Sequence, residues 1–525
     1  MNLYDDVDVL IIGTGIAGLV AALKLSKFSE RKLNICVLSH AEDPLITNTS
    51  YAQGGIIYSK DEEKIFVRDL REASGMTNSE KVCEFFAQYS AKYLEEILIH
   101  DCETNFEKDH ADHLLFTKEA AHSSPRILYR GDYTGLEIQK SLLNYLKNIS
   151  QVKILSRHTA IDLVTATHHG REHAFKYDED GVLGAYVFNQ ESKKVHLIMA
   201  RKTIIATGGM SALYRYHTNR ETCRGDGLAM AKRAGAQVLD MEYVQFHPTA
   251  LYLGAHSKRF LISEAVRGEG GVLINKKGEA FMQKYHPLKE LAPRDIVSRS
   301  IVFEMIEQES DCVYLDISHK DPQWIQLRFP KIYEHCLQHN LDITKTPIPV
   351  VPAAHYSCGG IKTNLKAETN LKNLYAVGEV ACTGLHGANR LASTSLLEGL
   401  TFAAIAAEEI MNFFKNDRAQ PFDRSKIKEW IYANKNVDKA LIAQDYLTIK
   451  QTMWNYAGLI RSQNRLKRAF AMMLEMKEEV EKFYKDAELS DELIGLKNAV
   501  EVSLMVIQSS MRNQESVGTF YKILD

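Results

Sequence analysis

The first forty residues carry the hydrophobic pattern of a β-α-β unit. Residues 7–12 (VDVLII) are an almost unbroken apolar run, which predicts a buried parallel strand. Residues 16–27 follow with a helical pattern, and residues 34–39 (NICVLS) form a second apolar run of strand length. Two strands joined by one helix at this spacing indicate that the chain opens with a nucleotide-binding fold.

Further along, short strands are predicted after a long helical stretch. A polar-rich segment that we expect to be helical extends to about residue 150. Strand-like runs follow at 152–155, 182–188 and 195–199. The sequence TIIATGG at 203–209 predicts another strand that ends in a glycine turn.

The second half of the chain changes character twice. Between about residues 240 and 354, loops, glycines and prolines are denser, which indicates an inserted domain, and from residue 416 onward the pattern is helical throughout. We therefore predict an α/β protein, in which a Rossmann-like domain surrounds an inserted α+β capping domain and is followed by a C-terminal helical bundle. The predicted domains are 1–240 and 355–415 (the Rossmann-like domain in two parts), 241–354 (the cap) and 416–525 (the bundle).

Composition excludes several classes of function. The chain has 525 residues, 45% hydrophobic and 25% charged, with a net charge of −3, so nothing indicates nucleic-acid binding. The acidic first residues do not resemble a secretory signal, and no apolar run reaches the ~18–20 residues of a membrane helix. The eight cysteines form no C-x-x-C pair, which argues against an iron–sulfur, zinc or haem site and fits reduced thiols in the cytoplasm.

Gly13, Gly15 and Gly18 have the spacing of a dinucleotide cradle. The first glycine permits a tight turn, the second allows the backbone to approach a pyrophosphate, and the third allows the helix to pack on the strand. The helix then directs its free N–H groups at the phosphates. Ser39 stands where such folds usually place a ribose-binding carboxylate, and it does not identify the cofactor.

Histidines and arginines in irregular segments are the candidates for chemistry. Gln245 and His247 lie two residues apart, on the same side of an extended segment, and His355 precedes a glycine turn. They are either structural histidines or a binding pair, and their spacing is not that of a zinc site. Arg294 and Arg390 stand among small residues, as surface ion pairs or as rigid forks that grip carboxylates.

Two further segments fit either a surface loop or a binding role. Residues 48–55 (NTSYAQGG) are small and polar, and their adjacent glycines allow close approach to a flat ring. Residues 117–126 carry Glu119, whose carboxylate can receive a substrate ammonium group. The residue pattern alone does not choose between these alternatives.

Together, these segments resemble the succinate dehydrogenase/fumarate reductase flavoprotein superfamily, and within it the members that oxidise L-aspartate. The resemblance covers nearly the whole chain. It is carried in order by residues 13–18, 51–55, 206–209, 225–227, 245–249, 263–270, 291–295, 352–356, 378–379 and 386–393.

This resemblance implies FAD-dependent oxidation of L-aspartate to iminoaspartate, with oxygen or fumarate re-oxidising the flavin. In such members this reaction is the first step of NAD (quinolinate) biosynthesis from aspartate. The implied catalytic residues are Arg390, His355 and His247 as carboxylate ligands, Ser263, Gln245 and Glu264 beside them, Glu119 as the ammonium ligand, and Arg294 as proton donor or acceptor.

The cofactor implied by the resemblance is FAD, held non-covalently in a Rossmann-like FAD-binding domain. Asn48 stands where the respiratory members carry the histidine of a covalent flavin link. The residues expected to contact FAD are Gly13, Thr14, Gly15, Ile16, Ala17, Gly18, Ser39, Asn48, Thr49, Ser50, Tyr51, Ala52, Gln53, Gly54, Gly55, Thr159, Ala160, Thr207, Gly208, Asp226, Glu379, Ser395 and Leu396.

Three positions depart from the family pattern. Ser263 replaces the usual threonine and keeps its hydroxyl. Near the C-terminus, Val517 and Phe520 replace an arginine and a histidine. No family role is therefore carried over to the last segment, and the helical domain is expected to seat more loosely on the rest of the molecule.

Two alternatives stay open from the sequence. One is a soluble fumarate reductase or succinate dehydrogenase flavoprotein, and the other is a flavin-binding subunit without turnover of its own. The expected partners are a small dicarboxylate (L-aspartate or fumarate) and a quinolinate-forming enzyme, with no metal, nucleic acid or membrane. The expected assembly is a monomer or weak oligomer.

Overall fold

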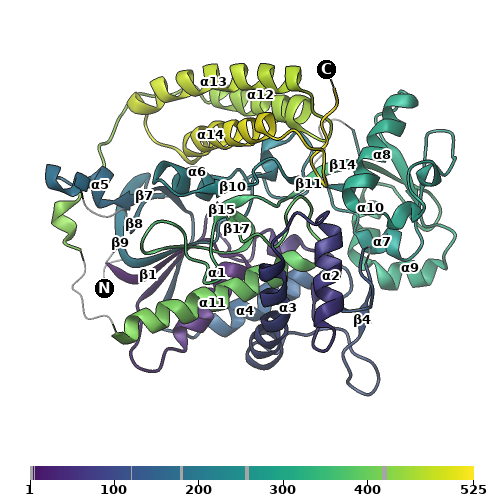
Figure 1. Cartoon of the computed structure of the whole chain (residues 1–525), viewed down its shortest axis with the longest axis horizontal. Coiled ribbons are helices and arrows are strands. Elements are labelled where there is room, and N and C mark those ends of the chain that lie inside the picture. The colour runs from purple at the N-terminus through teal and green to yellow at the C-terminus, as the bar shows by residue number, and fades with distance from the viewer. Residues whose placement is uncertain are drawn as a thin grey trace.

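A seven-stranded sheet forms the centre of the nucleotide-binding part in the computed structural model, which describes residues 4, 6–119, 121–177, 181–254, 259–416 and 422–524 (Figure 1). The strands lie in the order β6-β2-β1-β9-β8-β7, and β16 also pairs with β9. Their bounds are β1 (Val7–Ile12), β2 (Ile35–Leu38), β6 (Val152–Leu155), β7 (His158–Thr165), β8 (Val182–Asn189), β9 (Lys194–Ile205) and β16 (Leu374–Ala376).

The sheet has a parallel and an antiparallel part, and the long strand β9 belongs to both. Residues 200–205 of β9 pair in parallel with β1, and 203–205 also pair with β16, whereas residues 194–199 pair antiparallel with β8. The carboxyl ends of β1, β2 and β9 therefore lie together at one edge, the usual position of a ligand in this kind of sheet.

Two sets of helices cover the two faces of this sheet. On one face, α1 is buried from Ile16 to Leu25, because it lies between the sheet and α11. On the other face, α6 lies between the sheet and the C-terminal helices, which form the upper layer of Figure 1. The helices of these layers are α1 (Ile16–Ser26), α2 (Glu63–Ala73), α3 (Glu80–Leu94, continued by the π-helical stretch Glu95–Asp101), α4 (Thr134–Leu146), α5 (Ala166–His169), α6 (Asp226–Arg233) and α11 (Thr394–Asn416).

A second, antiparallel sheet with its own core lies on the right of Figure 1. Its order is β11-β14-β13-β12, with bounds β11 (Val244–Leu251), β12 (Val272–Ile274), β13 (Val313–Asp316) and β14 (Ile348–Ser357). The helices packed on it are α7 (Glu264–Gly268), α8 (Arg294–Glu307), α9 (Pro322–Arg328) and α10 (Pro330–Gln338). The boundary expected at 354/355 falls inside β14, and the division into domains remains a prediction.

Two small sheets and several short turns complete the α/β part. The small sheets are β10 (Val238–Leu239), β15 (Gly360–Lys362) and β17 (Ala381–Cys382), and β3 (Ile56–Ile57), β5 (Ile127–Leu128) and β4 (Phe116–Thr117). Short 3-10 turns lie at Thr49–Tyr51, His173–Tyr177, Ser211–Leu213, Met282–Lys284, Lys289–Leu291, Gly378–Val380 and Arg424–Lys426.

The C-terminal part contains three long helices, α12 (Lys439–Ala457), α13 (Gln463–Asp486) and α14 (Asp491–Arg512). Each begins after a polar residue whose side chain accepts a backbone hydrogen bond, namely Asp438, Ser462 and Ser490. The expected boundary at 415/416 lies at the end of α11, next to residues 417–421, which are outside the described residues.

The expectation that the chain is helical throughout from residue 416 is wrong for two stretches. Residues 422–438 contain only one 3-10 turn, and residues 513–524 are irregular. Ile427 and its neighbours pack individually against the antiparallel strands β7 and β8 rather than as the stripe of a helix. Among the described residues, no helix is long and apolar enough to cross a membrane.

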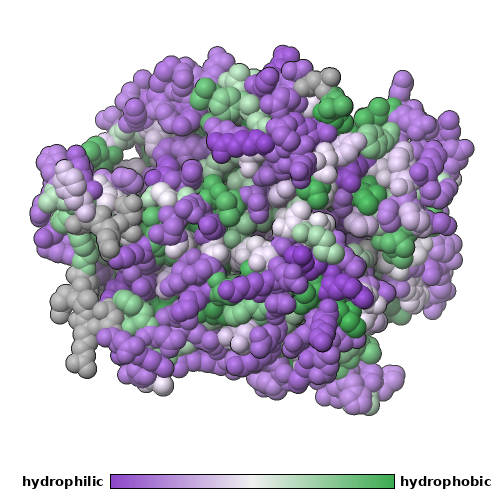
Figure 2. Space-filling view, viewed as in Figure 1, coloured by the Kyte–Doolittle hydropathy of each residue, from purple (hydrophilic) through white to green (hydrophobic). Residues whose placement is uncertain are grey.

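The face of the molecule in Figure 2 is mostly hydrophilic, with hydrophobic side chains scattered over it rather than gathered in one continuous area. Individual exposed apolar residues of this kind are ordinary in globular proteins.

Candidate active site

A cavity lies at the carboxyl ends of β1, β2 and β9. It reaches from the loop after β1 to β14 and the start of α11. The expected cofactor residues in its lining are Gly13, Thr14, Gly15, Ile16, Ala17, Ser39, Asn48, Thr49, Tyr51, Ala52, Thr159, Ala160, Thr207, Gly208, Asp226, Glu379, Ser395 and Leu396.

The glycine turn after β1 is shaped by steric limits. Gly13 has φ +121°, and a Cβ there would lie 2.2 Å from the carbonyl oxygen of Ala206. Gly15 is the N-cap of α1 and has no side chain that could cap the helix. The backbone N–H of Ile16 donates to Thr49 Oγ1 at 3.0 Å. The positively polarised start of α1, which has no capping side chain from its own N-cap residue, borders the cavity and suits a pyrophosphate.

The other end of the cavity contains a half-buried carboxyl group and a second helix start. Glu379 Oε1 accepts from the backbone N–H of Ser357 at 3.0 Å, and burial raises the pKa of Glu379 to about 7. Ser395 and Leu396 stand in the first turn of α11. Thr207 Oγ1 is buried without a hydrogen-bond partner in the described structure, as expected where a polar ligand completes the site.

Five of the expected cofactor residues do not line this cavity: Gly18, Ser50, Gln53, Gly54 and Gly55. Gly18 packs α1 on the strand, because a Cβ there would lie 2.0 Å from Gly13 O. The Ser50 hydroxyl donates to the carbonyl of Leu45, and Gly55 packs against β5. Contact between these five residues and the cofactor remains a prediction.

Other cavity residues were not predicted from the sequence. His40 and Thr47 adjoin predicted positions, so a wider window around Ser39 and Asn48 would have included them. Asn219 and Cys223 lie in a loop with no motif, and only the fold brings that loop to the cavity.

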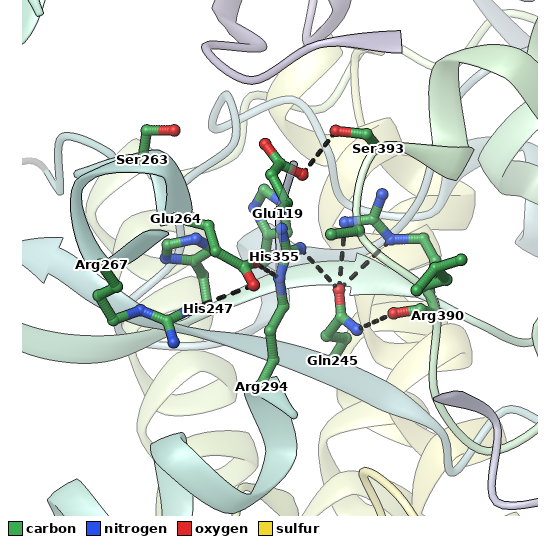
Figure 3. Close-up of polar contacts among 12 residues, drawn as sticks. Glu119, Gln245, His247, Ser263, Glu264, Arg267, Arg294, His355, Arg390 and Ser393 are labelled. Atoms are coloured by element: carbon green, nitrogen blue, oxygen red, sulfur yellow. Dashed lines mark hydrogen bonds and ion pairs between the residues drawn. The ribbon is translucent and has the colours of Figure 1, made fainter. Parts of the chain in front are cut away.

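Beside the cavity, seven of the eight expected catalytic residues meet in one cluster, in which all but the half-buried His355 are buried (Figure 3). Gln245 and His247 come from β11, His355 from β14, Glu264 from α7, Arg294 from α8, and Arg390 from the loop before α11. Ser263 stands apart in Figure 3, and its hydroxyl caps α7 by accepting from the N–H of Ala265 at 3.2 Å. Contact between Ser263 and a substrate remains a prediction.

The amide of Gln245 bridges the two expected arginines. Its Oε1 accepts from Arg294 Nη1 at 3.0 Å and from Arg390 Nη2 at 3.1 Å. Burial, followed by the charge of Arg294, lowers the pKa of Arg390 to about 10, so Arg390 is still charged at neutral pH. Two permanent cations therefore border one small space, as a dicarboxylate ligand requires.

The two histidines are close together and neutral. Their ring centroids lie 5.2 Å apart, and the pKa of each is lowered well below its ordinary range, first by burial and then by Arg294. His247 Nδ1 accepts from the backbone N–H of Thr249 at 3.2 Å, so its proton is on Nε2. His355 Nδ1 lies 2.7 Å from the hydroxyl of Thr218.

Glu264 lies between two arginines. It accepts a short hydrogen bond from Arg294 Nε, and its Oε1 is 3.7 Å from Arg267 Nη2. Burial alone would raise the pKa of Glu264, but these guanidinium groups outweigh it and lower the pKa. Arg267 is fully buried and was not among the expected site residues, although it stands within the 263–270 motif.

Glu119 enters the site from the loop after β4. Its Oε2 accepts from the Ser393 hydroxyl at 2.7 Å, and a Cβ at Gly54 would lie 2.9 Å from its Oε1. Burial, followed by the negative charge of Glu264, raises the pKa of Glu119. Among the described residues, no group of three or more His, Cys, Asp and Glu side chains could hold a metal ion.

Comparisons with known proteins agree with this geometry. The model of a family of FAD binding domains matches residues 8–396. The chain is 37% identical to an L-aspartate oxidase of Vibrio cholerae and 38% identical to one of Pseudomonas aeruginosa, each over 98% of this chain and 95% of the relative. The chain belongs to the L-aspartate oxidase family. A chloroplastic L-aspartate oxidase of rice (Oryza sativa) is 36% identical, over 98% of this chain and 81% of its own length.

The fold of this L-aspartate oxidase family member is similar to that of fumarate reductases. A quinol fumarate reductase FrdA variant of E. coli superposes with a TM-score of 0.87 at 26% identity, over 100% of this chain and 92% of that chain. The predicted mixed α/β fold with C-terminal helices is confirmed, as is the resemblance to the succinate dehydrogenase/fumarate reductase superfamily.

Proposed function

We propose that this protein is a flavoenzyme that oxidises L-aspartate to iminoaspartate. The observation that carries the proposal is the joint presence of Arg294, Arg390 and Glu119 in one buried site. Two guanidiniums match the two carboxylates of the substrate, and the third group is an acid placed to meet an ammonium group. Membership of the L-aspartate oxidase family supports the same reaction.

In this proposal, the carboxylates are held by Arg390, His355 and His247. The neutral imidazole of His247 presents its Nε2–H as a hydrogen-bond donor, since Nδ1 is occupied by the N–H of Thr249. A neutral donor adds no like charge beside Arg294 and Arg390, and a rigid, preorganised set of donors lowers the barrier by orienting the substrate.

The ammonium group is assigned to Glu119. The Ser393 hydroxyl donates to Glu119 Oε2, which leaves Oε1 for the substrate. Because burial and Glu264 raise the pKa of Glu119, the incoming cation stabilises the ionised form of a carboxyl group that is reluctant to ionise alone. Selection of an amino acid over a simple dicarboxylate would then depend on this side chain.

Proton movement is assigned to Arg294 together with Glu264 and Arg267. An isolated guanidinium is a poor base, because its pKa exceeds ~12. Glu264 lies between the two guanidiniums, hydrogen-bonded to Arg294 and 3.7 Å from Arg267, and is the carboxylate that would exchange a proton with Arg294. The redox chemistry of the site, with hydride taken from the substrate Cα and electrons given to oxygen or fumarate, would be supplied by FAD.

We also propose that FAD is bound without a covalent link. Asn48 lines the cavity, and its Oδ1 accepts from the backbone N–H of Arg220 at 3.1 Å. An amide lacks the nucleophilic nitrogen that a histidine uses for a flavin bond. Acid precipitation should leave a yellow supernatant and a colourless pellet, and a yellow pellet would contradict this expectation.

The proposed reaction also suggests a partner enzyme, a cellular location and an assembly state. Iminoaspartate is a reactive imine, so a quinolinate-forming enzyme that consumes it is the proposed partner, and the proposed place is the cytoplasm, at the first step of NAD biosynthesis. A monomer or weak oligomer is the proposed assembly.

Anaerobic reduction tests the activity. L-aspartate should bleach the oxidised flavin band of the purified holoprotein, and succinate should not. Bleaching by succinate alone would assign the protein to the succinate/fumarate branch, which the likeness to quinol fumarate reductase makes the second candidate. No bleaching by either compound would indicate a flavin-binding subunit without turnover.

A further inference from the structure

We propose that Asp295 and Asn389 are positioning residues that fix the direction of the Gln245 amide, and through it the two substrate-binding arginines. The inference rests on the proposed function for the identity of the ligand, a four-carbon dicarboxylate. It concerns residues that do not touch the substrate space but determine how the groups around it are oriented.

The amide of Gln245 has a direction that matters. Its oxygen faces Arg294 and Arg390, whose guanidiniums are donors only, and its Nε2 donates to the carbonyl of Arg390 at 2.8 Å and to Asn389 Oδ1 at 2.7 Å. If the amide were reversed, its NH₂ group would face two cations. Both guanidiniums would then lose a buried acceptor and repel each other without a shared partner.

The carboxylate of Asp295 acts on this direction together with the Arg390 carbonyl. Asn389 Nδ2 donates to Asp295 Oδ1 at 3.1 Å. A carboxylate can only accept, so Asn389 turns its NH₂ group toward Asp295 and its oxygen toward Gln245. Gln245 in turn directs its own NH₂ group at Asn389 and its oxygen at the arginines. The two amides form a head-to-tail line between an acceptor-only end and a donor-only end.

The carboxylate is itself anchored from the C-terminal segment. Asp295 Oδ2 accepts from Arg299 Nη2 at 2.9 Å, and Arg299 Nη1 donates to the carbonyl of Gly518 at 2.7 Å. The next residue, Thr519, donates from its backbone N–H and its hydroxyl to the carbonyl of Ala388, at 2.9 and 2.8 Å. The segment after α14 therefore fixes both ends of the Asp295–Asn389 contact.

A simpler role for Asp295 is that of an acid in the first turn of α8, where it interacts with the helix dipole. That role needs only a negative charge near the helix start. It does not depend on which amide Asp295 contacts, and it gives no reason for activity to return when the carboxylate is moved to position 389.

Exchanging the two side chains therefore tests the proposal. In Asp295→Asn, the single amide oxygen can accept from Arg299 or from Asn389, whereas the carboxylate of Asp295 accepts from both. In Asn389→Asp, two carboxylates face each other. In the double variant D295N/N389D, residue 295 accepts from Arg299 and donates to the carboxylate at 389, which still accepts from Gln245. The hydrogen bonds between Arg299, residues 295 and 389 and Gln245 are retained, and so is the net charge.

The measurements are the dissociation constant for succinate, from its shift of the oxidised flavin spectrum, and the KM and kcat for L-aspartate. Each single variant should weaken succinate binding about tenfold, the scale of a lost charge-assisted hydrogen bond, and should raise KM more than it lowers kcat. The double variant should return to within about threefold of the original protein. FAD content and thermal midpoint identify any variant that fails to fold.

Unchanged succinate binding in Asp295→Asn, or a double variant as weak as the single ones, would overturn the proposal. If the single variants do not fold, Asn389→Ala is the alternative, because it removes the hydrogen bonds of Asn389 to Gln245 and Asp295 without placing a new polar group there. This variant should also bind succinate about tenfold more weakly. Unchanged binding in that variant would count against the proposal in the same way. Failure of the original protein to oxidise L-aspartate would instead contradict the proposed function, so the two outcomes are distinct.

Discussion

At the scale of single residues, the site separates permanent charge from charge that can vary. Arg390 stays protonated because its pKa of about 10 lies above neutral pH, and His247 and His355 stay neutral because their pKa values are well below the ordinary range. Glu119 is the substrate-site carboxyl group whose pKa is raised above its ordinary range, first by burial and then by the charge of Glu264. Dicarboxylate binding should thus vary little with pH, whereas ammonium binding should vary with Glu119.

Replacing Glu119 with glutamine tests that separation. Glu119→Gln should raise the KM for L-aspartate at least about tenfold, because a charge-assisted contact is lost, and should change the KM for fumarate by less than about threefold. Steady-state kinetics with each substrate provide the measurement. Ser393→Ala, which removes only the hydroxyl that holds Glu119 Oε2, is the matched control with a smaller effect. Equal effects on both substrates would refute the assignment.

The half-buried carboxyl group of Glu379 should make the stability of the protein depend on pH. Burial raises its pKa from 4.5 to about 7, so between these values the folded state binds more protons than the unfolded state. The contribution of Glu379 to stability is therefore lost as pH rises through this window. The thermal midpoint of the flavin-free protein should fall less between pH 5 and pH 8 in Glu379→Gln than in the original protein. An identical pH dependence in both would contradict this prediction.

At the scale of elements, turns and helix starts border the sites. α1 and α11 both begin at the cofactor cavity, while α7 and α8 begin with Glu264 and Arg294. Side chains at such positions are fixed by the backbone of the first turn, and the free N–H groups add a positive potential beside an anionic ligand.

The turn before α1 gives a steric prediction. Gly13→Ala should yield protein without flavin, since its Cβ would overlap the carbonyl oxygen of Ala206 at 2.2 Å and its φ is +121°. Gly278→Ala is the control, because Gly278 also has a positive φ, +81°, but a Cβ there meets nothing within 4 Å. The ratio of flavin absorbance to protein absorbance distinguishes the two. Full flavin content in Gly13→Ala would show that the turn can rearrange.

Elements with a local signal were predictable from the sequence, and those set by distant contacts were not. The Gly13 turn was predictable because its steric requirement lies within a few residues, and the fold class followed from hydrophobic periodicity. Asn219 reaches the cavity only through the fold, and residues 422–438 were misread as helical because they pack piecewise on a sheet formed far away in sequence. The capping role of the Ser263 hydroxyl was likewise invisible without the backbone of α7.

At the scale of the whole molecule, the C-terminal helices are tied to the cofactor side of the sheet. Asp491, at the start of α14, accepts from the Thr159 hydroxyl at 2.6 Å and from Arg224 Nη2 at 3.0 Å, and it lies 2.9 Å from His40 Nε2. Thr159 and His40 both line the cofactor cavity. Burial would raise the pKa of Asp491, but Arg224 and His40 outweigh it and lower the pKa.

Loss of this carboxylate should weaken both stability and cofactor binding. Asp491→Asn should reduce the free energy of unfolding by about 2 kcal/mol, because the buried Arg224 loses one of its two carboxylate partners and keeps only Asp226, and should lower the affinity for FAD. Denaturant titration and flavin fluorescence are the measurements. Glu479→Gln disrupts an exposed pair with Lys482 and should change stability by less than about 0.5 kcal/mol. Unaltered FAD affinity in Asp491→Asn would show that the contact between α14 and the cavity does not affect cofactor binding.

The strand β14 has a consequence for opening and closing of the site. It begins in the second sheet at Ile348 and runs without a break through His355 to Ser357, whose N–H binds Glu379 beside the cavity. A rigid tilt of the second sheet would carry Gln245, His247 and Arg294 away from Arg390, whereas His355 would lie near the pivot, two residues before Ser357. Such a cap cannot merely uncover a finished site. An opened molecule would lose most of its substrate ligands at once, so substrate capture and assembly of the catalytic groups would be a single event.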